Sequence, residues 1–132
     1  LYPRLTNAKL RERALSAISR AASPESQAFL LSVARSTEES TSLRSTAISR
    51  LMRMDGARPA EITRLYDQTD DRRLREQLIA AYARHEAPEY TDKLIEIART
   101  GTDPQLRRAA INHLSKKNDP RTTKLLLEII DQ

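Results

Sequence analysis

One pattern constrains the fold of this chain more than any other feature, because it recurs four times. Each copy begins with Leu-Arg, has Ala or Leu and then Leu or Ile at the fourth and fifth positions after the leucine, and ends with a large residue at the eighth. The opening leucines are Leu10, Leu43, Leu74 and Leu106, which lie 33, 31 and 32 residues apart. A fixed period in this range is typical of chains that stack repeated pairs of secondary-structure elements.

The second half of each repeat begins at a proline. The prolines are Pro24, Pro59, Pro88 and Pro120, and each is followed six and seven residues later by two large side chains. This spacing is helical, and proline at the first helical position loses no hydrogen bond. Residues suited to cap a helix precede the expected starts of six helices: Asn7, Ser23, Ser40, Asp71, Asp103 and Asp119.

These signals predict an all-α protein with eight helices. We expect them over about residues 7–20, 24–36, 40–54, 59–69, 71–85, 88–99, 103–117 and 120–131. Gly56 and Gly101 follow two of these helices, where a left-handed residue is useful. The expected architecture is a right-handed α-solenoid of four two-helix repeats, over approximately residues 5–37, 38–69, 70–100 and 101–132.

The segment from Asp103 to Leu114 reads Asp-Pro-x-Leu-Arg-x-x-Ala-Ile-x-x-Leu. This pattern resembles the HEAT-like repeats, in particular the short bacterial repeats also found in phycobilisome lyases. The resemblance covers the whole chain, with the fourth repeat matching best and the second least. It implies a HEAT-like superhelix whose second helices line a concave binding groove.

Composition agrees with one solvated helical domain over residues 1–132. Hydrophobic residues make up 39% of the chain and charged residues 31%, with two glycines and no cysteine. The sequence therefore offers no disulfide or thiolate metal site, and it has no apolar run as long as a membrane span. The chain begins with Leu1, not Met, and we expect it to be a segment of a longer protein. No feature identifies the compartment, although the cytoplasm is slightly favoured.

The repeated arginine falls inside the core arc of each first helix. At 100° per residue it lies beside the opening leucine, so we expect these side chains to be partly buried between repeats. A buried guanidinium needs partners for its five donors, and two capping aspartates or the carbonyl groups at the ends of neighbouring helices could supply them. This structural ladder consists of Arg11, Arg44, Arg75 and Arg107 with Asp71 and Asp103. An anion-binding ladder is the alternative.

A second set of basic residues lies on the outward arc of the first helices. It would form a basic stripe that could meet acidic protein, nucleic acid or anionic lipid, or could simply complement the helix dipoles. The stripe consists of Arg13, Arg20, Arg50, Arg53, Arg84, Arg108, Lys116 and Lys117.

The outward face of the second helices carries charges of both signs, with acids at its centre. Acidic residues there oppose phosphate binding, and the aromatic residues are too few to stack bases. The candidate interaction surface consists of Phe29, Arg64, Asp67, Lys93, Glu96, Arg99 and Glu128.

Catalysis has little support in the sequence. His85 and His113 belong to no metal-binding motif, and two isolated glycines cannot form a phosphate loop. We therefore expect no enzyme activity, no cofactor and no bound metal, but a scaffold or protein-interaction module whose partner the sequence does not name. The alternatives are a nucleic-acid-binding solenoid that uses the basic stripe, and a regulatory domain attached to an enzyme.

The last helix is unusually apolar. Its large side chains span a wide arc, so we expect a patch around Leu125 and Ile129 that drives end-to-end self-association or is covered by a further part of the protein.

Overall fold

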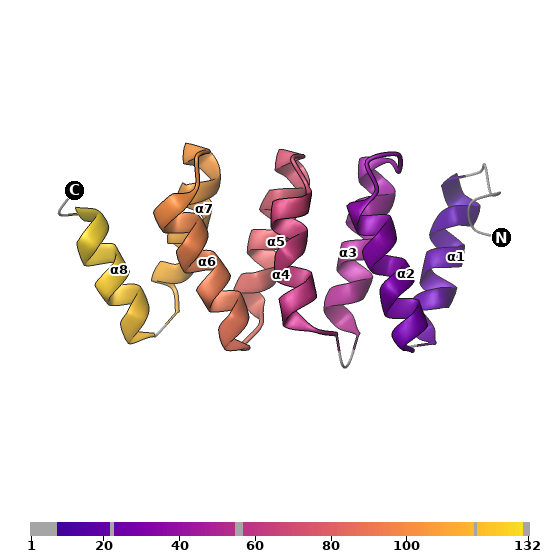
Figure 1. Ribbon diagram of the computed structural model, residues 1–132, viewed down its shortest axis with the longest axis horizontal. Helices are drawn as coiled ribbons and strands as arrows, with labels where there is room; N and C mark the ends of the chain where they lie inside the picture. Colours follow the sequence, from indigo (N-terminus) through magenta and orange to yellow (C-terminus); the bar gives the residue numbers. More distant parts are fainter. Residues whose placement is uncertain (1–7, 22, 55–56, 118, 131–132) are drawn as a thin grey trace. The chain divides into compact units, whose positions relative to one another are not determined.

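The computed structural model describes residues 8–21, 23–54, 57–117 and 119–130, and its regular structure in these ranges is helical throughout (Figure 1). The helices are α1 (Ala8–Arg20), α2 (Pro24–Arg35), α3 (Thr41–Arg53), α4 (Pro59–Gln68), α5 (Arg72–Arg84), α6 (Pro88–Thr100), α7 (Pro104–Ser115) and α8 (Pro120–Ile130). Each lies within a few residues of a helix predicted from the sequence. The expectation of an all-helical chain is confirmed.

Side-chain caps begin five of these helices, as the sequence predicts. The oxygen of the capping side chain accepts a hydrogen bond from a backbone N–H in the first turn, which would otherwise lack a partner. The capping residues are Ser23, Ser40, Asp71, Asp103 and Asp119. Asn7 lies outside the described residues.

The chain divides into two compact units, residues 1–74 and 75–132. In the first unit, α3 packs against α1 and α2, and α2 also packs against α4. In the second unit, α6 packs against α7 and α8, and α7 packs against α8. Each unit therefore places a second helix of one sequence repeat against both helices of the next.

The buried face of α3 shows why the repeated pattern specifies this packing. Leu43, Ala47, Ile48 and Leu51 are all buried, at the first, fifth, sixth and ninth positions of the repeat. These positions form one stripe on an α-helix. Removing such side chains from water supplies most of the free energy of folding.

The apolar positions of the repeat are not buried equally at the two ends of the sequence. The opening leucine is buried in α3, α5 and α7, but Leu10 in α1 is 48% exposed. Seven residues after the proline, Leu31 in α2 is buried, whereas Leu127 in α8 is 58% exposed. A side chain that packs against the adjacent repeat inside the array is thus open to solvent in α1 and α8.

The expected exposure of Leu125 is wrong. Leu125 is fully buried, and the equivalent residue of α6, Lys93, is buried too, because the fifth position after the proline faces inward in both helices. Leu126 and Ile129 are half-buried, and Leu127 is the exposed large apolar residue among the α8 side chains that the structure describes.

The expected role of Gly101 is also wrong. Its φ is −61°, so it does not adopt the left-handed conformation. Instead, a Cβ at this position would lie 2.5 Å from the carbonyl oxygen of Ile97 and 3.0 Å from Cγ of Arg107. Glycine is required here because the backbone approaches its neighbours closely. Gly56 lies outside the described residues.

Candidate interaction surface

Arg44 connects the ends of two second helices inside the first unit. Its side chain is buried; Nε donates a hydrogen bond to the carbonyl of Ala34 at 3.0 Å, and Nη2 donates to Oγ1 of Thr69 at 3.0 Å. Ala34 lies in the last turn of α2, where carbonyl groups have no partner within the helix. The guanidinium thus satisfies a free carbonyl and places positive charge at a helix C-terminus.

Arg107 makes the equivalent contact in the second unit. Its Nε donates to the carbonyl of Ala98 in the last turns of α6, at 3.0 Å, and the side chain is half-buried. Asp103 accepts hydrogen bonds from backbone N–H groups at the start of its own helix, as Asp71 does. The recurring partner of Arg44 and Arg107 is therefore a helix-terminal carbonyl.

The first arginine of the ladder is placed differently. Arg11 forms an ion pair with Glu39, with 2.9 Å between Nη1 and Oε1, and remains 26% exposed. Arg75 is half-buried.

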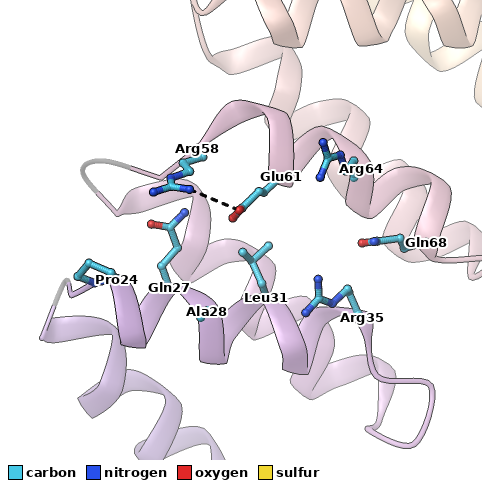
Figure 2. A pocket seen from close by; sticks show the side chains of 9 residues that line it. All are labelled: Pro24, Gln27, Ala28, Leu31, Arg35, Arg58, Glu61, Arg64 and Gln68. Atoms are coloured by element: carbon cyan, nitrogen blue, oxygen red, sulfur yellow. Dashed lines mark ion pairs between the residues drawn. The ribbon is translucent and has the colours of Figure 1, made fainter.

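The surface between α2 and α4 contains a groove of about 380 Å³ (Figure 2). Pro24, Ala28 and Leu31 supply its apolar part from α2. Its polar lining consists of Gln27, Arg35, Arg58, Glu61, Arg64 and Gln68. Figure 2 shows Arg58 and Glu61 at one end of the groove and Arg35, Arg64 and Gln68 toward the other.

Positive charge exceeds negative charge in this groove, because three arginines accompany one glutamate. Arg58 and Glu61 are 3.9 Å apart in an exposed ion pair. Neither the Arg35 nor the Arg64 side chain has a hydrogen bond or ion pair to another described residue. In addition, α4 has no side-chain cap at Arg58, and Glu61 is the acidic residue of its first turn.

The matching surface between α6 and α8 carries paired charges. Arg99 and Glu128 form an ion pair at 2.9 Å, and Arg121 bonds to Asp92 across the two helices. Lys93 contacts Glu96 at 2.5 Å. The prediction that Lys93 belongs to an exposed interaction surface is wrong, because its side chain is only 8% exposed.

The remaining residues of the predicted interaction surface do not gather in one place. Arg64 lines the groove, whereas Asp67 is exposed outside the groove lining and Phe29 is half-buried. The sequence did not point to Arg58, Gln27 or Gln68. Arg58 precedes α4 and therefore lies outside the helical periodicity from which the surface was predicted.

The predicted basic stripe is exposed at six of its eight positions. Arg50 and Lys117 are half-buried: Arg50 donates to Oγ of Ser16 at 3.0 Å, and Lys117 donates to the carbonyl of His85 at 3.3 Å. The exposed members are Arg13, Arg20, Arg53, Arg84, Arg108 and Lys116. Arg13 and Arg20 also line a shallow hollow of about 540 Å³ along α1.

The surroundings of the two histidines differ: His113 lies near basic side chains, and His85 lies against an aromatic ring. The pKa of His113 is lowered by burial first and then by the positive charges of Lys116 and Arg84. The His113 side chain is half-buried. The ring centroids of His85 and Tyr90 are 5.3 Å apart. Tyr90 also stacks on Tyr82, with 5.4 Å between the ring centroids. Burial raises the pKa of Tyr90.

In the part of the chain that the structure describes, no three or more metal-binding side chains lie together, and no helix is long and apolar enough to cross a membrane. Comparison of the chain with protein-family models, curated proteins and solved structures gave no match.

Proposed function

We propose that this chain is a right-handed α-solenoid of four HEAT-like repeats and acts as a non-catalytic protein-interaction or scaffolding module. The observation that carries the proposal is the groove between α2 and α4, where Arg35 and Arg64 have no partner among the described residues. Exposed guanidinium groups beside an apolar floor provide both the charge and the contact area that protein recognition uses.

The nucleic-acid alternative depends on the basic stripe of the first helices. Two of its members, Arg50 and Lys117, bond to other residues of the chain, which favours a structural role for them. On the second helices, the excess of positive charge at α2 and α4 is not repeated at α6 and α8, where the charges are paired. Binding that rests on neutralising many phosphates favours a longer positive surface.

Photo-crosslinking in the full-length protein tests this function. A photoreactive residue placed at Arg64 or Arg99 samples the second helices, and one placed at Arg20 or Arg108 samples the first helices. We expect a defined protein to be linked from the second helices and, once purified, to bind the wild-type chain. Nucleic acid linked from the first helices would instead support the alternative.

We also propose that copies of the chain associate end to end through α8. Leu127 is exposed, whereas Leu31 is buried at the equivalent position, where α2 packs against α4. Leu10 of a second copy supplies a matching exposed leucine, and such a contact is heterologous. Light scattering should show concentration-dependent association that Leu127→Glu abolishes. Identical monomeric scattering for both chains would contradict it.

A further inference from the structure

The groove between α2 and α4 has an unbalanced set of charges. Arg35, Arg58 and Arg64 face a single carboxylate, Glu61, and the Arg58–Glu61 contact is a long, exposed pair that holds neither side chain strongly. A guanidinium offers five donors in a planar fork that matches a carboxylate. Two of these forks have no acceptor among the described residues, so the groove is suited to a ligand that brings carboxylates.

The positions of the arginines define how the carboxylates must be spaced. Arg58 and Arg64 are six residues apart at the start of α4, which corresponds to about 9 Å along a helix axis. A peptide in the extended polyproline II conformation advances about 3.1 Å per residue with three residues per turn, so two acidic residues three positions apart lie on the same side and cover about the same length. Arg35, the last residue of α2, faces the end of the groove where Arg64 lies (Figure 2).

The middle of the groove favours an apolar stretch between those acids. Ala28 and Leu31 lie between the two charged ends, and Figure 2 shows them on the α2 side of the groove. Gln27 and Gln68 place amide groups at the two ends, where they can bond to a peptide backbone.

Nucleic acid fits this groove less well than a peptide. Glu61 lies among the lining residues and repels any anion beside it; a nucleic acid carries a phosphate at every nucleotide, whereas a peptide can place an uncharged residue there. No aromatic ring is among the groove residues that the structure describes, so bases have no stacking surface here.

We propose that the groove between α2 and α4 binds an extended acidic segment of a partner protein, with two acidic residues three positions apart and small or apolar residues between them. Arg58 binds one acidic side chain, and Arg64 with Arg35 binds the other. This ligand class rests on the proposed interaction function and makes it specific.

Fluorescence anisotropy at physiological salt tests the proposal with the full chain. The probe is a labelled peptide that contains Glu-Leu-Ala-Glu between Gly-Ser flanks. Arg64→Gln and Arg35→Gln should each weaken binding about tenfold, as expected for the loss of one charge-assisted hydrogen-bonded contact. Arg20→Gln removes the same charge from exposed α1 and should change the affinity less than about twofold.

Two further probes separate specific recognition from attraction by net charge. The first peptide places the two glutamates side by side at unchanged net charge, and the second replaces both with glutamine. Both should bind much more weakly than the original. The proposal is overturned if the first binds equally well, if Arg20→Gln weakens binding as much as Arg64→Gln, or if an oligonucleotide of equal charge displaces the peptide equally.

A double variant of unchanged net charge can introduce an ion pair across the groove, like the pair between Asp92 and Arg121 that crosses from α6 to α8. Asp92 lies four residues after the proline that begins α6, and the exposed Ala28 holds the same position in α2. Arg121 lies one residue after the proline that begins α8, and the exposed Ala60 holds the same position in α4. Ala28→Asp with Ala60→Arg should therefore form a new ion pair across the groove. We expect the affinity for the peptide to fall at least about tenfold with an unchanged circular-dichroism spectrum. Full affinity in this variant would place the peptide elsewhere and overturn the proposal.

The outcomes also distinguish the ligand class from the wider function. A protein that crosslinks to the second helices while the peptide fails would retain the interaction function and reject the acidic segment. Peptide binding without any protein linked at the second helices would reject the interaction function itself.

Discussion

The surface between α2 and α4 differs from the surface between α6 and α8, although both join consecutive second helices of the repeat. Two ion pairs cross from α6 to α8, Arg99 with Glu128 and Arg121 with Asp92. Between α2 and α4 lies a groove with three arginines and one glutamate. The same packing of helices thus supports one surface with satisfied charges and one with charges available to a ligand.

One of the two ion pairs is excluded in the first unit by the residues at exposed positions that the apolar pattern leaves free. Ala28 and Ala60 hold the positions that Asp92 and Arg121 hold in the second unit, so no ion pair can form there. Changes at such positions cost little stability. A repeat protein can therefore open or close a binding surface without altering its core.

Arg44 and Arg107 give the largest expected difference between the units. Arg44→Ala removes two hydrogen bonds and leaves the buried carbonyl of Ala34 without its donor, so it should lower the free energy of unfolding by about 3 kcal/mol. Arg107→Ala removes one such bond at a half-buried side chain and should cost about 1 kcal/mol. Urea unfolding of both variants measures the difference. Equal losses would show that the two arginines have equivalent roles.

The second-largest difference in stability is expected for substitutions in the connections that follow α2 and α6. α2 and α3 are joined by residues 36–40, whereas only residues 101–103 join α6 to α7. Gly101→Ala would place a methyl group against the Ile97 carbonyl and should destabilise by about 2 kcal/mol, as overpacking does. Ser36→Ala, in the longer connection, is the control and should cost less than about 0.5 kcal/mol. Thermal unfolding followed by circular dichroism compares them, and a neutral Gly101→Ala would disprove the close-packing argument.

Removing an ion pair from the surface between α6 and α8 tests whether unpaired charge alone distinguishes the two surfaces. Asp92→Ala with Arg121→Ala removes the exposed ion pairs of Arg121 with Asp92 and with Asp119, and should change the free energy of unfolding by less than about 1 kcal/mol. The variant should not bind the acidic peptide, because Arg99, at the position equivalent to Arg35, is paired with Glu128, and Leu125 holds the position equivalent to Arg64. Chemical denaturation and anisotropy test the two statements separately. Peptide binding by this variant would show that an open surface alone is sufficient.

Low pH should slightly lower the stability of both units, because it protonates the aspartates that cap their helices. The pKa of Asp71 is lowered chiefly by the hydrogen bond from the backbone N–H of Leu74, and the pKa of Asp119 by that from Arg121. A carboxyl group with a lowered pKa in the folded state stabilises above its ordinary pKa of about 3.9, and this contribution is lost as the pH falls through the lowered value. Unfolding free energies should therefore be level from neutral pH to about pH 5 and decline below about pH 4. Asp71→Asn should reduce that decline without abolishing the helix cap; an unchanged pH profile would contradict this.

The sequence alone predicted the helices and the residues that face the core. The leucine and proline patterns located the eight described helices to within a few residues, and five predicted caps accept the expected backbone hydrogen bonds. It also placed Arg44 in the core arc of α3, where the side chain is buried. These features depend on helical periodicity and on interactions within a few residues, which a single sequence contains.

Tertiary packing decided which surface positions work together. Lys93 and Leu125 were predicted to be exposed and are buried, because the inward arc of α6 and α8 is wider than the sequence pattern indicated. Arg58, which lies outside the helical pattern, reaches the groove only because α4 packs beside α2. Which charges are paired and which remain available depends on side chains about 30 residues apart in the sequence, and only the packing of one helix against the next brings them within reach.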